Sequence, residues 1–586
     1  MNLKQSPNPK TGRTYLSIVK GYREAGTGKA KAKTVLALGY LDDLQQDYPD
    51  PIAHFKEVAR QMTEEENAHR QLSLNINMDE DLSLNQNLSQ NIGYAAIMQI
   101  YNALDLPLFL RKCARGRGFK YDTNAIMALL VISRLLSPGS KKKAYEERNR
   151  YFERFNFSLA DVYRALSHYA HISQDVQRHI NERIASTYGR DSRVIYYDVT
   201  NYYFEIDAED ELRKYGLSKE KRRDPIVQMG LAMDAEGIPL HYELFSGNIP
   251  DKSTFRSVIG EIRRHYDTGR IIVVADMGII TGDNIYYLVG GEKREKSLNG
   301  YIFSFSVRGG TQDFQAYVLD ENEYRDALGN PVTADTDFKL KSRIIAREVT
   351  VTLSNGRKAK RTVYEKQIVF WSRKYAERAR RERGKVVTKA LSLVSEPHKY
   401  SSATSRGAAK YVKSMKVDTS TGEMTHSDRV PVFDAEKVCA EELLDGYYSI
   451  VTSETDMPEQ EVIETYRGLW EIEETFRITK GTLETRPVYV SREDRIEAHF
   501  LTCYIALVIA RLLQKQVGKH VSVDKILECL RNLTCTLEAD NIYLFGYRSD
   551  LSDEIGNALD IDFKKKRLRL ADIKSMISKS KNRLRA

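Results

Sequence analysis

The sequence of 586 residues has few cysteines and no long apolar run. Its five cysteines are scattered and lack the paired short spacing of zinc sites and disulfide frameworks, so we expect a reducing, cytoplasmic environment. Residues 1–13 contain no apolar signal-peptide core. The most apolar stretch, residues 500–513, is shorter than the ~20 residues of a membrane span. These absences predict a soluble protein that is not exported and has no membrane partner.

Basic residues are in moderate excess, 90 Lys and Arg against 81 Asp and Glu, which gives a net charge of +9. Such an excess favours a polyanionic partner without requiring one. Charge is concentrated at the start, where residues 1–34 hold eight basic side chains and one acid. We interpret residues 1–50 as a basic N-terminal arm, with an ordinary solvated arm as the alternative.

The periodicity of apolar residues changes along the chain. Residues 51–186 have helical spacing and are interpreted as a helical DNA-binding region, and residues 516–586 as a basic helical C-terminal region. Residues 311–444 contain a hairpin pattern around Asn355-Gly356 followed by a basic helical stretch, which we interpret as a β-rich inserted domain. There is no internal repeat and no coiled-coil pattern.

Between these regions the pattern predicts three strands, a helix and a fourth strand. The strands begin near Val194, Ile226 and Pro239, and the helix begins at Asp251 or Ser253. A short β-branched run, residues 271–275, follows as a buried strand. Nucleases with a ribonuclease-H-like fold share this order of elements.

Two aspartates stand in or beside these strands. Asp198 lies in the C-terminal half of the first strand, and Asp276 ends the fourth. An unpaired carboxylate in such apolar surroundings costs several kcal/mol unless a cation or hydrogen-bond donors satisfy it. Strand ends are also where open α/β sheets place ligand groups. Either aspartate alone could equally cap a turn.

A third acid, Glu473, falls on the apolar stripe of a helix predicted over residues 458–482. At 100° per residue, the seven-residue steps from Tyr466 to Glu473 and from Glu473 to Lys480 align all three side chains on one face. The alternative is an amphipathic helix with one buried ion pair, because Glu473 and Arg477 have i,i+4 spacing. Three carboxylates suit phosphodiester chemistry with two divalent ions.

The segment Tyr466-Arg467-Gly468-Leu469-Trp470-Glu471-Ile472-Glu473-Glu474-Thr475-Phe476-Arg477 closely resembles the signature helix of bacterial insertion-sequence DDE transposases. That helix carries tyrosine, arginine, glutamate and lysine. The strands around Asp198 and Asp276 resemble the first two acidic motifs of the family, and the resemblance extends from Arg193 to about Phe500.

The resemblance implies that Asp198, Asp276 and Glu473 are the catalytic and metal-binding residues. They would hold two Mg²⁺ ions, for which Mn²⁺ should substitute. It also implies DNA contacts by Tyr466 and Lys480. Leu469 stands where the family has arginine, and Arg477, within about 20° of the Tyr466 face, is a candidate replacement.

The predicted fold is α/β. A ribonuclease-H-like core, residues 187–310 and 445–515, is interrupted by the β-rich insertion and flanked by helical terminal regions. The implied function is that of a bacterial DNA transposase that binds terminal inverted repeats, cleaves DNA and transfers strands. Its partners would be transposon-end and target double-stranded DNA, with a homodimer in the DNA complex and association with the nucleoid when bound.

Basic residues between the first two strands, near the expected active face, are further candidates for DNA contact: Lys219, Arg222 and Arg223. Three alternative functions stay open. They are a ribonuclease-H-like DNA nuclease without strand transfer, a host-adopted DNA-binding protein without catalysis, and a glycosidase with a carboxylate pair.

Overall fold

The computed structural model places the chain in two compact units, residues 1–85 and 86–586. The residues that it describes are 1–9, 11–23, 30–68, 79, 81, 89–220, 223–266, 268–290, 299–333, 335–396, 407–416, 429–539 and 541–582. Arg222, one of the candidate DNA contacts, lies outside the described residues.

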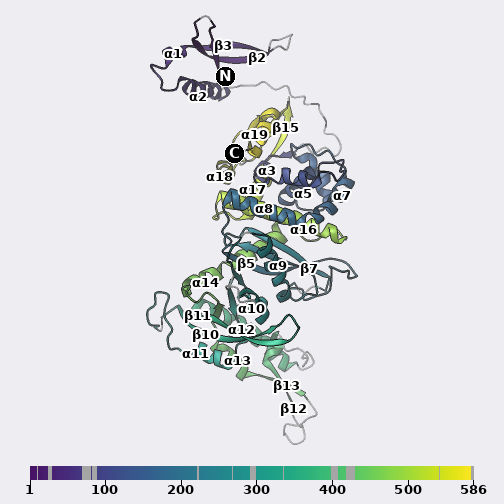
Figure 1. Cartoon of the computed structure of the whole chain (residues 1–586). Helices are drawn as coiled ribbons and strands as arrows, with labels where there is room; N and C mark the ends of the chain where they lie inside the picture. Colours follow the sequence, from purple (N-terminus) through teal and green to yellow (C-terminus); the bar gives the residue numbers. More distant parts are fainter. Residues whose placement is uncertain are drawn as a thin grey trace. The chain divides into compact units, whose positions relative to one another are not determined.

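The first unit is a three-stranded antiparallel sheet with two helices (Figure 1). Its elements are β1 (Asn2–Pro7), β2 (Thr14–Arg23), β3 (Ala30–Tyr40), α1 (Leu41–Leu44) and α2 (Pro51–Ala68). Leu16 and Ile18 of β2 are fully buried, and α2 packs on β1. The alternative interpretation, a solvated arm, is therefore not found over residues 2–7, 14–23 and 30–40, and residues 51–68 belong to this unit. The basic side chains had masked a weak strand pattern, because most of β3 is exposed.

The second unit begins with a short strand and a helical region. These elements are β4 (Ser89–Asn91), α3 (Tyr94–Ala103), α4 (Leu106–Ala114), α5 (Thr123–Leu136), α6 (Lys141–Glu146), α7 (Leu159–His171) and α8 (Ser173–Tyr188). Several starts follow the capping rules of their sequence, with Asp122, Ser140 and Ser158 each accepting a hydrogen bond from a first-turn amide. The region is helical, as the spacing of its apolar residues predicts.

A mixed sheet of eight strands follows, in the order β10-β11-β14-β9-β8-β5-β6-β7. The first part of the chain to enter it consists of β5 (Val194–Tyr203), β6 (Ile226–Asp234), β7 (Pro239–Ser246), α9 (Asp251–His265), β8 (Ile272–Ala275), α10 (Gly282–Leu288) and β9 (Gly300–Phe305). This is the predicted order of three strands, a helix and a strand. The strands β5, β6 and β7 are antiparallel neighbours, whereas β5, β8 and β9 run parallel. The fold class is mixed α/β.

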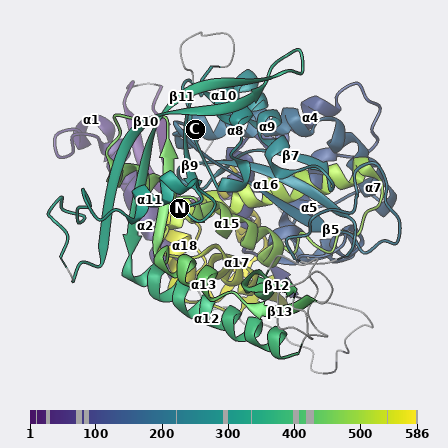
Figure 2. The ribbon, with the colours of Figure 1, turned by 90° about the horizontal axis from the view of Figure 1, so that it is seen from below.

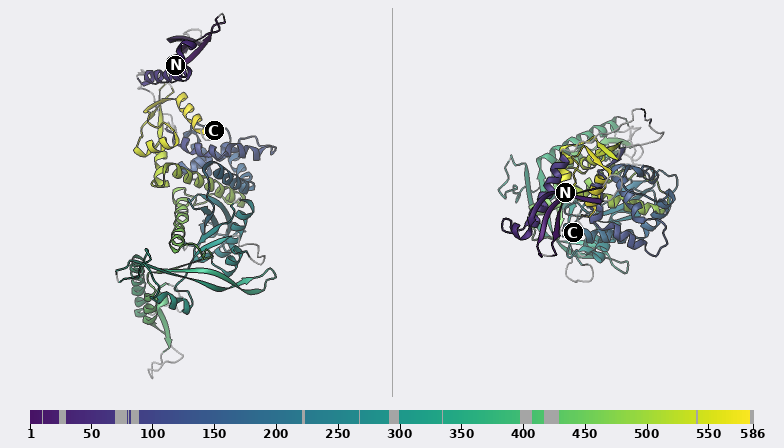
Figure 3. Two further views of the ribbon diagram at one scale, coloured as in Figure 1. Left: turned by 60° about the vertical axis from the view of Figure 1, so that its left-hand side comes forward. Right: turned by 90° about the horizontal axis from the view of Figure 1, so that it is seen from above.

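The region predicted as an inserted domain contributes to the same sheet. It contains α11 (Gln312–Leu319), β10 (Phe338–Thr352), β11 (Lys358–Ser372), α12 (Arg373–Ser395), β12 (Val412–Lys416), β13 (Arg429–Phe433) and α13 (Ala435–Leu443). The hairpin turns at Gly356, as predicted, and its strands are the long ribbon in the left view of Figure 3. Because β11 pairs with β14 (Tyr447–Thr452), the hairpin extends the core sheet and does not form a separate β domain.

The signature segment is helical but is not one regular helix. It consists of α14 (Glu459–Arg467), α15 (Trp470–Arg477) and a π-helical turn (Ile478–Thr482). At the junction, the amides of Leu469 and Glu471 bond to carbonyls three residues earlier, so the turn tightens there. The single helix predicted over residues 458–482 therefore has two local irregularities.

A long apolar helix, α16 (Glu493–Val517), forms the centre of the second unit and packs against α5 and α7 (Figure 2). Among the described residues it is the one helix long and apolar enough to cross a membrane, and 94% of its apolar window is buried inside the fold. Its apolar composition is therefore that of a helix buried in the core of the second unit.

The C-terminal region is mixed and not only helical. It contains α17 (Val523–Asn532), β15 (Thr534–Ala539), β16 (Ile542–Phe545), α18 (Asp550–Leu559), β17 (Arg567–Arg569) and α19 (Leu570–Asn582). Its strands pair with β4 in the order β17-β16-β15-β4. The ends of the second unit are therefore joined by one small sheet.

The two faces of the large sheet bury different side chains because residues alternate along each strand. From β5, Ile195, Tyr197 and Val199 enter a core shared with α9 and α10. Tyr196 and Tyr202 enter the opposite core, which includes α16. Asp198 shares the parity of Tyr196 and Tyr202, so it stands on the α16 side of the sheet.

Candidate active site

Asp198 and Asp276 lie in register on neighbouring parallel strands. The pairing of β5 with β8 matches Tyr196 to Val274, and each aspartate comes two residues after its member of that pair. Asp198 is the fifth of ten residues in β5, so it lies at the middle of the strand and not in its C-terminal half, where it was predicted. Asp276 follows β8 directly, as predicted. The sheet therefore presents both carboxylates side by side on one face.

Asp276 is exposed and held by its neighbours. Its Oδ1 accepts hydrogen bonds from the amide of Met277 at 2.7 Å and from the hydroxyl of Ser304 at 2.6 Å. Ser304 Oγ in turn accepts a hydrogen bond from the amide of Met277 at 2.9 Å. Asp276 thus caps a short 3-10 turn, as the alternative interpretation held.

Asp198 is partly buried among other charged groups. Its Oδ1 accepts a hydrogen bond from the amide of Val199 at 2.7 Å. Lys219 Nζ lies 3.8 Å from Asp198 and 4.0 Å from Asp251, the first residue of α9. Burial raises the pKa of Asp198 to about 6; Lys219 opposes this rise, and Asp276 and Asp251 add to it. These surroundings favour a cation next to Asp198.

The signature segment docks directly over these strands. Tyr196 Oη, two residues before Asp198, donates a hydrogen bond to the carbonyl of Thr465 at 2.9 Å. A Cβ on Gly468 would lie 2.0 Å from the same Tyr196 oxygen, so only glycine allows this close approach. The helix α14 also packs on β8 and β9, and α15 packs on β5.

Tyr466 reaches the Asp276 side of the site. Its phenol interacts with Ser304 and Asp276, and burial raises the pKa of Tyr466 to about 12, with Asp276 and Glu473 adding to the rise. The structure therefore brings Tyr466 together with Asp276, and Glu473 is near enough to affect it electrostatically.

Glu473 is exposed, contrary to its expected place on the buried stripe. The buried acid of α15 is Glu471, whose carboxylate lies 3.5 Å from the buried guanidinium of Arg511 on α16. The tightened junction before α15 changes the angular relation on which the alignment of Tyr466 with Glu473 depended. No hydrogen bond or ion pair joins Glu473 to another residue in the described part of the chain.

In the described ranges, no three acidic, histidine or cysteine side chains lie close enough to hold a metal ion. Glu473 therefore does not form one ligand cluster with Asp198 and Asp276 in this structure. The ammonium of Lys219 is the positive group at the acids. Its position shows that Asp198 and Asp251 accommodate a cation.

The bases expected to contact DNA have different environments. Lys480 lies in the π-helical turn, partly buried, 3.3 Å from Glu220. Arg477 does not pair with Glu473; its guanidinium bonds to Glu474 at 2.7 Å and to Asp524 at 2.7 Å. These contacts direct the Arg477 side chain toward α17. Leu469, which stands where the family has arginine, is buried, and Arg477 does not take the place of that arginine in this structure.

Lys219 and Arg223 lie on the segment between β5 and β6, both exposed. Lys219 donates a hydrogen bond to the carbonyl of Val199 in addition to its contact with Asp198. Of the two described candidates on this segment, Lys219 therefore lies beside the carboxylates of Asp198 and Asp251.

The sequence matches the profiles of two known protein families. The profile described as "Transposase DDE domain" matches residues 190–509, more than half of the sequence and the whole span from Asp198 to Glu473. The chain belongs to the DDE transposase family. The profile described as "IS1634 family transposase, N-terminal domain" matches residues 3–72, which supports an insertion-sequence transposase. The resemblance recognised from the signature segment is confirmed.

Two further comparisons add little. No curated protein matches the transposase. A solved structure, described as "Cryo-EM structure of piggyBac transposase synaptic complex with hairpin DNA", aligns over 83% of this chain and 84% of that one, with 7% identity and a TM-score of 0.35. This similarity is too weak to support an inference about the transposase.

Five residues of the site were not predicted from the sequence. They are Asp251, Ser304, Tyr196, Glu220 and Arg486, the second ion-pair partner of Glu220, and each acts through a partner distant in sequence. Asp251 was assigned only to capping α9. Gly468, inside the signature segment, was the one signal available, because a glycine in a helical pattern often marks a close approach.

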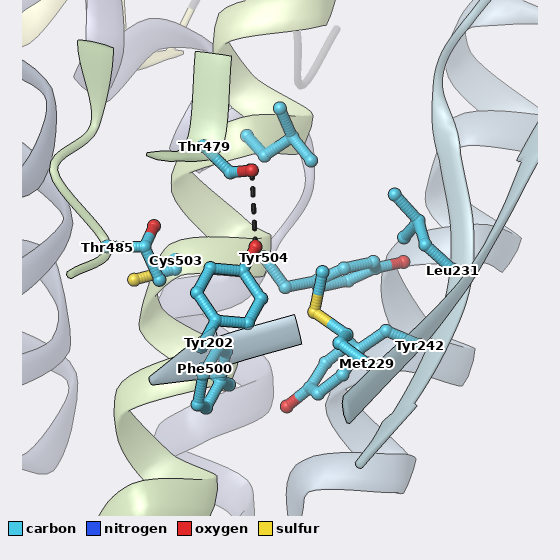
Figure 4. Close-up of a pocket in the computed structure, with 10 residues that line it drawn as sticks. Tyr202, Met229, Leu231, Tyr242, Thr479, Thr485, Phe500, Cys503 and Tyr504 are labelled. Atoms are coloured by element: carbon cyan, nitrogen blue, oxygen red, sulfur yellow. Dashed lines mark hydrogen bonds between the residues drawn. The ribbon is translucent and has the colours of Figure 1, made fainter. Parts of the chain in front are cut away.

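The apolar pocket beneath the site is not a substrate site. It is lined by residues of β5, β6 and α16, including Tyr202, Met229 and Phe500 (Figure 4), and its volume is about 10 Å³. That is the space of about one water molecule. The hydroxyl of Tyr202 bonds to Thr479 at 3.3 Å, which anchors the π-helical turn to β5.

Proposed function

We propose that this transposase binds the terminal inverted repeats of its insertion sequence, cleaves the phosphodiester at each end and joins the freed 3′-hydroxyl to target DNA. The observation that carries the proposal is the register of Asp198 and Asp276 on β5 and β8, on the face where the signature segment docks. The order β7-β6-β5-β8-β9, in which β6 runs antiparallel to the other four strands, supports a ribonuclease-H-like core.

The acids fit a divalent cation. Asp198 is an anion whose burial is unfavourable, and a positive group already lies between it and Asp251. Asp198 and Asp276 would hold Mg²⁺, or Mn²⁺ in its place, and Glu473, exposed and without a partner among the described residues, would complete the set. Two such ions, when bound, would activate the attacking oxygen and stabilise the leaving one. DDE transposase domains generally depend on divalent metal ions.

The remaining groups would position DNA. Tyr466, beside Asp276 and Ser304, would contact the backbone near the cleaved phosphate. Lys480, Lys219, Arg222, Arg223 and, with its present partners displaced, Arg477 would contact phosphates. The helical region would add DNA contacts outside the core. Because two ends must be joined, the active complex would contain two protomers, which bind transposon-end and target DNA.

The test is cleavage of a labelled duplex that carries the terminal repeats of the element, with Mg²⁺. We expect Glu473→Gln and Asp198→Asn each to lower cleavage by at least about a thousandfold, because each removes a charged ligand from the proposed metal site. Glu461→Gln is the matched control for Glu473→Gln. Glu461 is also exposed, on α14, and should keep full activity.

The products separate the alternatives. Strand-transfer products from the wild type support the transposition reaction. Cleavage without joining favours a nuclease, and specific end binding without cleavage favours a DNA-binding protein that has lost catalysis. Cleavage that survives both substitutions contradicts the assignment of the acids.

A further inference from the structure

An acidic residue of the transposase occupies a pocket of positive charge beside the site. The carboxylate of Glu220 lies 3.3 Å from Lys480 Nζ and forms a hydrogen-bonded ion pair with Arg486. All three side chains are largely withdrawn from solvent, with 28%, 16% and 26% of the Glu220, Lys480 and Arg486 side chains exposed. The two bases thus enclose one anionic group.

The two bases are also held by contacts that do not involve Glu220. Lys480 lies 5.4 Å from the ring centre of Tyr202, and Arg486 lies 5.4 Å from that of Tyr203. The two rings belong to consecutive residues of β5. Burial lowers the pKa of Lys480, whereas Glu220 raises it, so the ammonium depends on an anionic neighbour.

The pocket also lies close to the acids on the same strand. Tyr202 is four residues after Asp198, which corresponds to about 13 Å along β5. At about 3.4 Å of helix axis for each nucleotide of a strand, that distance spans roughly four nucleotides. A DNA strand that runs along β5 from Asp198 would therefore reach this pocket about four nucleotides away.

We propose that Lys480 and Arg486 form a binding site for a DNA backbone phosphate, and that Glu220 fills this site as an internal anion until DNA displaces it. A guanidinium can pair with either a carboxylate or a phosphate through two parallel N–H···O hydrogen bonds, and an ammonium binds either anion as a point charge. This inference rests on the proposed DNA-cleaving function and adds Arg486 and Glu220 to it.

Displacement of Glu220 would also affect Lys219, the residue before it in the chain. Lys219 places its ammonium at Asp198 and Asp251, while Glu220 places its carboxylate at Lys480 and Arg486. The two adjacent residues therefore neutralise both charged parts of the site at once. Entry of a phosphate at the pocket would release the segment that also carries Lys219.

The test is the affinity for a fluorescein-labelled duplex, measured by anisotropy without divalent ions. Glu220→Gln removes the internal anion and is expected to tighten binding by about three- to tenfold. Glu211→Gln is the matched control, because Glu211 lies on the same segment, is exposed and changes the net charge equally. It should alter affinity by less than about twofold.

Two further variants identify the pocket. Lys480→Gln and Arg486→Gln should each weaken binding and lower the salt dependence by about one counterion. In either background Glu220→Gln should tighten binding less than it does in the wild type, because only one base is then released. These two measurements also decide the matter if Glu220→Gln alone fails to fold, which thermal melting would reveal.

The possible failures are distinguishable. If the wild type binds no duplex, the proposed function fails. If it binds DNA but Glu220→Gln and Glu211→Gln behave alike, or the salt dependence of Arg486→Gln is unchanged, only the phosphate pocket is refuted.

Discussion

The two parts of the candidate site are built in different ways. Asp198 and Asp276 belong to adjacent strands, and main-chain pairing sets their relative position. Glu473, Arg477 and Lys480 belong to an irregular helical segment whose position depends on side-chain contacts with Tyr196, Arg511 and Tyr202. The strand part is therefore fixed by the sheet, whereas the helical part is fixed by a few packed contacts.

The two parts of the site also differ in how their charged side chains are paired. At the strands the acids are in excess, and Lys219 is the base that approaches Asp198. In the helical part, Arg477 and Lys480 are both paired with acids, and Glu473 is not. Arg477 and Lys480 are thus neutralised by carboxylates of the protein itself, whereas at the strands Lys219 compensates only part of the negative charge of the acids.

The largest effect is expected from changing the contact that joins the two parts. Gly468→Ala places a Cβ against the Tyr196 hydroxyl and should displace α15 from β5. A misplacement of about 1 Å can cost on the order of a hundredfold in rate, so we expect about that loss of DNA cleavage. Adding Tyr196→Phe, which removes the closest atom, should restore part of the activity. Full activity of Gly468→Ala would show that docking at this glycine does not position the helical part.

An intermediate effect is expected from Asp198, in the strand part of the site, and its size should depend on pH. Because the pKa of Asp198 is raised from 3.8 to about 6 in the folded protein, ionisation there costs stability. The cost is absent below about pH 4 and complete above about pH 6. Without divalent ions, Asp198→Asn should therefore be more stable than the wild type above pH 6, by up to roughly 3 kcal/mol. Its advantage should vanish toward pH 4.

Thermal or urea unfolding across this range measures the difference. The exposed Asp313 on α11 provides the control, since Asp313→Asn should show no such dependence on pH. A constant difference between Asp198→Asn and the wild type at all pH values would contradict the buried, anionic surroundings described for Asp198.

The smallest effect is expected from Arg477. Its ion pairs with Glu474 and Asp524 are exposed, and such pairs contribute about 0 to 1 kcal/mol to the free energy of unfolding. Arg477→Gln should therefore unfold within about 1 kcal/mol of the wild type. A larger loss of stability would mean that Arg477 holds the helical part to α17, and the contrast with the strand part would then be sharper.

The family, the order of the core elements and the positions of the two aspartates in or beside strands could be inferred from the amino-acid sequence alone. Those features rest on local signals, because β-branched and aromatic runs form strands, and the signature segment is contiguous. The sequence did not determine the sheet in β2 and β3, whose exposed basic residues resemble a solvated arm, or the assignment of the β10–β11 hairpin to the core sheet.

The exposure of Glu473 and the ion-pair partners of the site residues depend on tertiary packing and could not be inferred from the sequence. Helical periodicity assigned Glu473 to the buried face, but the tightened turn at Gly468 leaves Glu473 exposed and Glu471 buried against Arg511. The ion pairs of Glu220 with Lys480 and Arg486 join residues more than 250 positions apart, which no local pattern encodes. The acids could be found from the sequence because strand formation is local, whereas their ionic partners are selected by packing.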